Sequence, residues 1–442
     1  MSEPAVQAFL EEFERDAGDL DWLAPQRVAA IETFRRIGLP SLRQESWKYT
    51  DMRLLTRRRF HTLTRPDTSV ASAAALAHCY GPAACHELVF VNGRLASGAG
   101  GQSTPHGVRI ESLVGAGRTS PASVAGQLGR NAADDVRAFV ALNTALMSDG
   151  AVIDIDADTV MPGPIHLLYV CAPGGGPLAA YTRNLIRLGA NARATVIETY
   201  VGGDDNGNEY FTNAVTEVEL GPGAALEHYK VQQESVAAFH VGCLAVRQDR
   251  DSRFHSYSID LGGRLVRNDI DVRLAAEGAE ARLSGLYVAG GRQHMDNHTR
   301  IDHEQPHTRS IENYRGVLDG RARAVFNGKV VVHKDAQKTD AQQSNGNLLL
   351  SSEAEVDTKP ELEIYADDVK CSHGATVGQL DEDMLFYMRA RAIPEATARN
   401  LLTFAFADEV IRPIQCRMVR DRLERSVAAK LPGAAVIGQF MQ

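Results

Sequence analysis

The sequence lacks several features that would assign it to a common class of protein. None of its six cysteines forms a Cys-x-x-Cys pair, which argues against a zinc or iron–sulphur site held by this chain alone, because such sites need closely spaced ligands. The first residues contain no apolar segment typical of a secretory signal, and no run approaches the ~18 apolar residues of a membrane span. We therefore expect a cytoplasmic protein with reduced thiols and no membrane partner.

Positive charge and aromatic residues are also scarce. The net charge is −9 and the basic cluster at residues 57–59 is short, so we expect no general attraction to nucleic acid. Aromatic residues make up 6% of the chain, and no pair of carboxylates stands out on a common strand face. Both observations disfavour a polysaccharide-active enzyme.

The N-terminal third is predicted to be mostly helical. Apolar residues recur at helical spacing in residues 6–13 and 25–37, and Gly38 follows as a stop signal. A further helix is expected over residues 132–147. Between them, Asn92-Gly93 separates two apolar runs, which predicts a β-hairpin. We assign residues 1–148 to this N-terminal region.

From Ala151 the hydrophobic period changes from helical to alternating, and strand-like segments follow one another for more than two hundred residues. Small residues precede new strands at positions separated by 32, 28, 27, 43 and 32 residues, namely 192, 224, 252, 279, 322 and 354. Quasi-regular spacing of this kind favours a β-solenoid, whose stacked coils share one core, over a β-sandwich. The solenoid is assigned to residues 149–375.

The helical period returns near the C-terminus. Asp381 is well placed as an N-cap for a helix that contains Met384 and Met388. Pro394 is expected to start a helix over residues 395–411, and residues 416–430 are amphipathic. We therefore expect a helical domain over residues 376–442.

Residues 358–381 bring a cysteine and a histidine close together. The alternation in residues 362–369 predicts a strand, and Cys371 and His373 lie on its extension. Positions i and i+2 of a strand face the same side roughly 7 Å apart, so both side chains could bind one soft metal ion or cluster. Two ligands do not complete a site, however, and a small core cysteine beside a hydrogen-bonded histidine is the alternative interpretation. Gly374 and Gly378 are expected to turn the chain towards the helix.

Four further histidines invite a metal hypothesis, and their spacing argues against it. In extended structure, residues four apart are about 13 Å from each other, which is too far for two of them to bind one ion. Polar positions on a solenoid face are the favoured interpretation, although each could still combine with residues of a neighbouring coil. The four are His294, His298, His303 and His307.

Several segments closely resemble the SufB/SufD family of iron–sulphur cluster assembly scaffolds. The match is most specific in the last third of the chain, and Cys-Ser-His-Gly-Ala-Thr-Val-Gly together with the modest length favours the SufD-type branch. The segments that carry the resemblance are Glu45–Thr50, Phe326–Lys329, Ala336–Gln343, Asn347–Ser351, Lys359–Ile364 and Asp368–Gly378.

This resemblance implies a right-handed parallel β-helix flanked by helical regions. It also implies a complex with a SufB-type sibling and with a SufC-type ABC ATPase docked on the C-terminal helices. A transient iron–sulphur cluster would form at the SufB–SufD-type interface, with His373 as a ligand and Cys371 as the weaker candidate. The chain contains no Gly-x-x-x-x-Gly-Lys-[Ser/Thr] motif, so we expect a non-catalytic scaffold subunit without an ATP site. A purely structural platform and a homodimer of the isolated chain are the alternatives.

Overall fold

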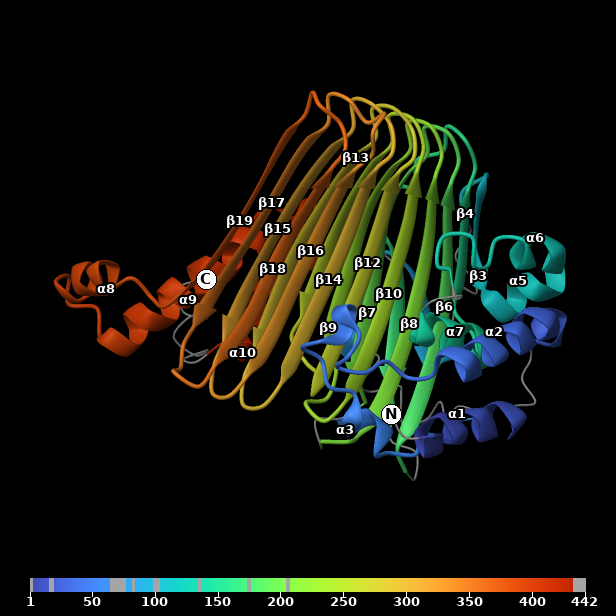
Figure 1. Cartoon of the computed structure of the whole chain (residues 1–442), viewed down its shortest axis with the longest axis horizontal. Helices are drawn as coiled ribbons and strands as arrows, with labels where there is room; N and C mark the ends of the chain where they lie inside the picture. Colours follow the sequence, from blue (N-terminus) through green and yellow to red (C-terminus); the bar gives the residue numbers. More distant parts are fainter. Residues whose placement is uncertain are drawn as a thin grey trace.

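The computed structural model describes residues 3–15, 20–63, 77–81, 84–97, 104–133, 137–172, 176–203 and 207–431. A β-solenoid of about seven turns forms its centre, with helices at both ends of the chain packed around it (Figure 1). The predicted fold class, mainly β with flanking helices, is therefore confirmed.

Two sheets make up the solenoid. Sheet A has the order β18-β16-β14-β12-β10-β8-β6-β4-β3, and sheet B has the order β19-β17-β15-β13-β11-β9-β7-β5-β1-β2. From β4 to β19 each strand pairs in parallel with the strand two later in sequence, because the chain alternates between the two sheets. The strands are β1 (His86–Val91), β2 (Arg94–Ser97), β3 (Val108–Ser112), β4 (Ala151–Ile155), β5 (Ile165–Cys171), β6 (Leu178–Leu188), β7 (Arg193–Gly202), β8 (Tyr210–Leu220), β9 (Ala225–Gln233), β10 (Phe239–Gln248), β11 (Arg253–Asp260), β12 (Leu265–Leu274), β13 (Glu280–Ala289), β14 (His294–His303), β15 (Arg309–Leu318), β16 (Arg323–Val332), β17 (Asp340–Leu349), β18 (Glu355–Ile364) and β19 (Lys370–Gly378).

The irregular spacing of small residues has a structural reason. Positions 192, 224, 252 and 279 lie at the corner where the chain passes from sheet A to sheet B, whereas 322 and 354 lie at the opposite corner. The interval of 43 residues is a change of corner and not a longer coil. Thr308 and Thr339 continue the first series, and both are buried.

Stacked aromatic rings mark the interior of the coils. Phe90, Tyr169 and Tyr200 occupy neighbouring strands of sheet B, with ring centroids 4.9 and 4.8 Å apart. Strand spacing places equivalent side chains of successive coils in contact, so one large side chain favours another at the same register position. This row is part of the main apolar core.

The N-terminal helices cover the outer face of sheet A. Their apolar residues form one cluster with Tyr181, Phe211 and Phe239 of strands β6, β8 and β10. The predicted hairpin is confirmed, because β1 and β2 pair antiparallel across Asn92 and Gly93, both at positive φ. The helices are α1 (Glu3–Arg15), η1 (Asp21–Leu23), α2 (Ala24–Ile37), η2 (Glu45–Trp47), α3 (Arg53–Thr56), α5 (Leu113–Thr119), α6 (Pro121–Ala125) and α7 (Ala138–Leu146).

Helix α7 begins later than predicted. The backbone N–H groups of Gly129, Asn131 and Ala132 donate to the carboxylate of Glu217, so this stretch is a loop anchored on β8. Residues 134–136 of the predicted helix lie outside the described residues.

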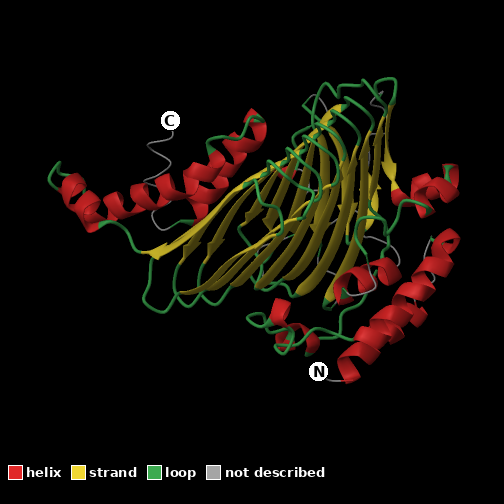
Figure 2. Ribbon diagram, turned by 45° about the horizontal axis from the view of Figure 1, so that its top comes forward, coloured by secondary structure: helices red, strands yellow, loops and turns green. Residues whose placement is uncertain are grey.

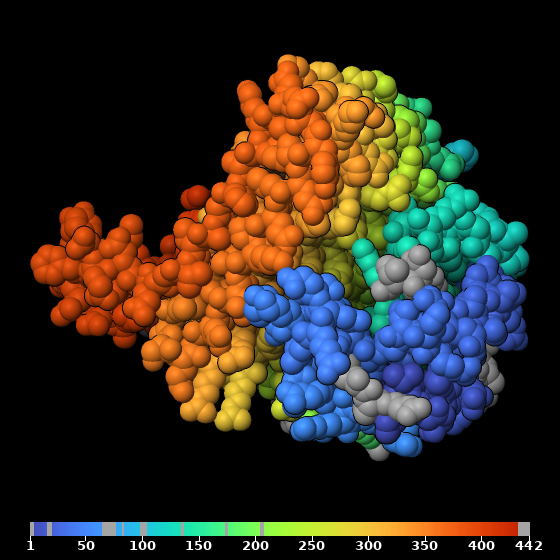
Figure 3. Space-filling view, viewed as in Figure 1, coloured from blue at the N-terminus to red at the C-terminus, as the bar shows by residue number. Residues whose placement is uncertain are grey.

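Three helices follow the solenoid: α8 (Glu382–Arg389), α9 (Glu395–Ile411) and α10 (Arg417–Lys430). The Asp381 carboxylate accepts from the N–H groups of Asp383 and Met384, which confirms the predicted N-cap. Helices α9 and α10 pack on the outer face of sheet B (Figure 2). Helix α8 projects from the body (Figure 3), and its Phe386 and Tyr387 are exposed.

Two local predictions for residues 358–381 are wrong. The segment forms two strands, because the chain turns at residues 365–369 from sheet A to sheet B, and Cys371 belongs to the second strand. Gly374 and Gly378 lie in β19 and do not form a turn, since their segment pairs with β17. The sheet thus runs to Gly378, and the division of the chain at residues 148 and 375 stays a prediction. In the described part of the chain, no helix combines the length and the apolar character needed to cross a bilayer.

Candidate functional site

In the last coil of the solenoid, both sheets end in a strand with which no further strand of the described residues pairs. Strand β18 ends sheet A and strand β19 ends sheet B, and residues 372–379 are all exposed. Exposed apolar side chains accompany these edges at Ile364, Tyr365 and Val377. An edge strand offers unpaired backbone groups to another chain, so this end of the molecule is a candidate binding surface. We call it the open end.

Cys371 and His373 lie on β19 at this open end. They pair in register with Ala341 and Gln343 of β17, which are buried. The two side chains therefore share one face of the strand, as the i, i+2 spacing predicted, and the burial of their partners on β17 shows that this is the interior side of the coil. Cys371 packs against a small apolar cluster of the last coils and is half-buried, whereas His373 is exposed.

A buried polar row leads from the interior to His373. Glu312, Gln343 and His373 occupy equivalent positions on β15, β17 and β19. Gln343 Nε2 donates to Glu312 Oε2 over 2.6 Å. Sequence reasoning gave no role to Glu312 or Gln343. Gln343 lies inside a segment that resembles the family, but only the strand register shows that it lies beside His373.

Burial changes the acid–base character of this row. It raises the pKa of Glu312 to about 7, because an ionised carboxylate in the solenoid interior loses its hydration. Burial also raises the pKa of Cys371 above its usual value. Near neutral pH the Cys371 thiol is therefore protonated, and a metal would have to displace that proton to bind sulphur.

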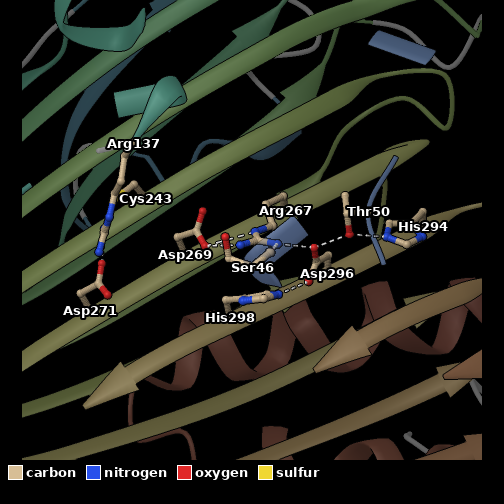
Figure 4. A network of polar contacts seen from close by, with 10 residues as sticks. All are labelled: Ser46, Thr50, Arg137, Cys243, Arg267, Asp269, Asp271, His294, Asp296 and His298. Atoms are coloured by element: carbon tan, nitrogen blue, oxygen red, sulfur yellow. Dashed lines mark hydrogen bonds and ion pairs between the residues drawn. The ribbon is translucent and has the colours of Figure 1, made fainter. Parts of the chain in front are cut away.

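The segment Glu45–Thr50 is held on sheet A by a separate network (Figure 4). Arg267 lies 4.3 Å from the Trp47 ring centroid, donates to the carbonyl of Ser46 and pairs with Asp296 over 2.6 Å. Asp296 also accepts from Thr50. Although burial opposes it, the charge of Arg267 holds the pKa of Asp296 far below its usual value. These contacts anchor the N-terminal region on sheet A through the segment Glu45–Thr50.

A cleft of about 580 Å³ lies beside this anchor, between the N-terminal helices and sheet A. Arg137 and Asp271 form an ion pair along it (Figure 4). Charged side chains of both signs line the cleft. Its cationic side chains, Arg137, Arg267, Arg300 and Lys329, each form an ion pair with a carboxylate of this chain. Its chemistry does not define a ligand class.

The four histidines do not form a common site. His294 contacts Thr50 and His298 contacts Asp296 on the outer face of sheet A, as the favoured interpretation predicted. His303 is buried at a corner between Thr308 and Ser310. His307 lies in the next turn at a φ of 58°.

A different group of side chains has metal-ligand geometry. Cys85, Glu87 and His166 offer ligand atoms that all lie within 4.8 Å of one another. Sequence reasoning missed this group because its members are separated by up to 81 positions and only the pairing of β1 with β5 brings them together. The motif Cys-x-Glu was the available signal, and it is weak.

Comparison with protein families identifies the class of protein. The model of the SUF system FeS cluster assembly SufBD core domain matches residues 171–406, and the model of the SufBD protein N-terminal region matches residues 11–167. Together they cover nearly all of the solenoid, the N-terminal helices except the first part of α1, helix α8 and part of α9. The chain therefore belongs to the SufBD family and has a role in iron–sulphur cluster assembly.

Particular relatives refine this assignment. The SufBD family protein slr0076 of Synechocystis sp. is 34% identical over 92% of this chain and 91% of its own length. The iron–sulphur cluster assembly protein SufD of Escherichia coli is 30% identical over 93% of this chain and 94% of its own. Protein ABCI7, chloroplastic, of Arabidopsis thaliana is 29% identical over 97% and 91%. The chain is thus similar to SufD along nearly its whole length.

Proposed function

We propose that this chain is a SufD-type scaffold subunit that pairs with a SufB-type sibling through its open end. The nascent iron–sulphur cluster would form at that junction and be handed on when a SufC-type ABC ATPase hydrolyses ATP. The similarity to SufD over nearly the full length supports the subunit type. The observation that carries the site is the exposed His373 on the uncovered edge strand β19.

The backbone of β19 supports strand pairing with a partner. The N–H of Lys370 donates to the carbonyl of Thr339, the residue immediately before β17, so the backbone groups of alternate residues from Lys370 onward point towards β17. The backbone groups of Cys371, His373 and Ala375 therefore point away from the sheet. A strand from a sibling could pair with them, and this would place its side chains beside His373.

His373 and Cys371 would supply part of the ligand shell. An exposed imidazole binds a metal through neutral nitrogen, and a thiol binds after losing its proton. Because Cys371 is half-buried with a raised pKa, His373 is the stronger candidate. The remaining ligands would come from the sibling, since two ligands do not complete a site.

The C-terminal helices are the proposed docking surface for the ATPase. Helix α8 projects from the body and exposes Met384, Phe386 and Tyr387. Apolar side chains exposed together on a projecting helix are typical of a protein-binding surface. Helices α9 and α10, in contrast, bury their apolar residues on sheet B. Partner binding at α8 could then be transmitted to the solenoid through Leu380 and Leu385, which pack against β17.

The test is coexpression of the chain with SufB-type and SufC-type partners, followed by anaerobic reconstitution. We would record visible absorption of the isolated complex for wild type, Cys371→Ala, His373→Ala and the control His106→Ala. The His106 side chain is also exposed, but the residue lies far from β19 in sequence. We expect His373→Ala to form the complex but to lose most of the iron–sulphur bands. Cys371→Ala should lose fewer, and His106→Ala none.

If both open-end variants match wild type while the complex still requires this subunit, the chain is a structural platform and the ligand role is wrong. A complex that assembles without this subunit and carries full cluster absorption would contradict the whole proposal.

A further inference from the structure

We propose that Cys85, Glu87 and His166, joined by Cys79, form a site for a zinc-type divalent transition metal that is separate from the open end. The site lies on the outer face of sheet B, between β1, β5 and the segment 77–81. Sulphur, nitrogen and carboxylate donors in one cluster are the set that Zn²⁺ prefers.

The three central residues are brought together by strand register. Glu87 of β1 pairs with His166 of β5, and His166 Nδ1 lies 2.7 Å from Glu87 Oε1. That distance requires a proton between the two atoms, and a cation would take its place. The three ligand atoms lie within 4.8 Å of one another. A tetrahedral zinc site has ligand atoms roughly 3.3–3.8 Å apart, so the longer separations would have to shorten by up to about 1 Å and the His166–Glu87 pair would have to open by about 0.6 Å.

His166 is already oriented as metal-binding histidines are. Its side chain is fully buried, and its Nε2 contacts the Thr199 hydroxyl at 2.9 Å. A partner on one ring nitrogen fixes the ring and leaves the other nitrogen directed at the metal. Burial lowers the pKa of His166, which favours the neutral imidazole that metals bind.

Cys79 would have to move towards the cluster to supply a fourth donor, because it is not among the residues whose ligand atoms all lie within 4.8 Å of one another. Its thiol hydrogen-bonds to the Glu87 carboxylate, and the Tyr80 N–H donates to the same carboxylate over 3.1 Å. Burial raises the pKa values of both cysteines, Cys79 and Cys85, to about 12. The thiols are therefore protonated at neutral pH, and metal binding would release their protons to solvent.

The charges around the cluster suit a divalent cation. Two thiolates and one carboxylate would carry three negative charges, and a divalent ion would leave one. Arg422 of α10 lies 3.8 Å from the Tyr80 ring centroid and donates to the carbonyl of Cys79. The positive charge of Arg422 would neutralise the one negative charge that remains. The site would thereby connect the segment 77–81 and β1 with α10, which are far apart in sequence.

The test is a Co²⁺ titration of the full chain, because cobalt replaces zinc in such sites and its thiolate charge-transfer absorption reports sulphur ligation. The titration uses a Cys371→Ser background, so that the open end contributes no thiolate. We expect one Co²⁺ per chain, displaced by Zn²⁺, with proton release. Cys85→Ser and Glu87→Gln should each weaken binding at least tenfold, and the buried control Cys243→Ser should not.

Thermal melting provides a second readout that does not depend on cluster assembly. Zn²⁺ should raise the melting temperature of wild type and of Cys243→Ser, but not that of Glu87→Gln, which keeps the size of the side chain. Absence of thiolate absorption in the Cys371→Ser background would overturn the site, as would unchanged Co²⁺ binding in both Cys85→Ser and Glu87→Gln. Loss of binding in these two variants but not in Cys79→Ser would support the three central residues and overturn the fourth.

Discussion

The two ends of the solenoid are built differently. At the N-terminal end, each sheet finishes with a short antiparallel strand, β2 in sheet B and β3 in sheet A, and helices cover the outer face nearby. At the C-terminal end, the long parallel strands β18 and β19 finish the sheets, and no further strand of the described residues pairs with them. A parallel edge exposes a regular row of backbone donors and acceptors, which proteins usually protect. The difference supports the proposal that the C-terminal end of the solenoid binds a partner.

The ion pairs at the two ends also differ in burial. Arg183 and Glu217 are paired over 2.6 Å below α7, and both are buried. At the open end, by contrast, Arg323 and Glu355 are paired over 2.8 Å with both side chains exposed. Breaking a buried pair leaves one charge without compensation, whereas water replaces the partner in an exposed pair.

The largest expected effect is the loss of Glu217. Glu217→Ala would leave the buried guanidinium of Arg183 unpaired and would remove the acceptor for three backbone N–H groups. We expect a loss of about 3–5 kcal/mol in the free energy of unfolding, measured by chemical denaturation. The matched control is Glu355→Ala at the open end, which should cost less than about 1 kcal/mol. Equal effects of the two variants would contradict the contrast between the ends.

A somewhat smaller effect on the free energy of unfolding is expected from the ionisation of Glu312. Its pKa in the folded protein is about 7, against an ordinary value of 4.5. An acid with a raised folded pKa stabilises the fold most below its unfolded pKa, and that contribution is lost as pH rises from 4.5 through 7. We expect the free energy of unfolding to fall by up to about 3 kcal/mol between pH 5 and pH 8.

The variant Glu312→Gln should abolish this pH-dependent fall, because an amide does not ionise. Unfolding curves for wild type and Glu312→Gln at pH 5 and pH 8 measure it. If the two proteins show the same pH dependence, the Glu312 carboxyl does not titrate in this range.

The smallest expected effect is on the affinity for a partner strand at β19, the edge strand of sheet B. Ala375→Pro removes one N–H that points away from β17, so the isolated chain should unfold with little change. Association with the SufB-type partner should weaken by about tenfold, the value of one lost hydrogen bond. Ala375→Val keeps the N–H and is the control, and binding can be measured by titration calorimetry. Unchanged affinity in Ala375→Pro would show that β19 does not pair with the partner in this way.

Much of the fold was predictable because the signals are local. Asn92-Gly93 specified a hairpin through its left-handed backbone, Asp381 specified a helix start through its side-chain cap, and residues 395–411 specified α9 through Pro394 and helical spacing. Alternating polarity and recurring corners predicted the solenoid. The spacing failed to show that the corners belong to two series, because small residues at opposite corners look alike in sequence.

The candidate sites also combine features that are predictable from local sequence with features that only the tertiary structure shows. The spacing of Cys371 and His373 determined that both face one side of a strand, since that follows from the period of two. Only the tertiary structure showed that this strand is the last of its sheet, that Glu312 and Gln343 lead to it, and that Cys85 meets His166. Contacts between distant residues depend on which strands pair and in what register. The stacking of whole coils fixes these two properties, and no local pattern encodes them.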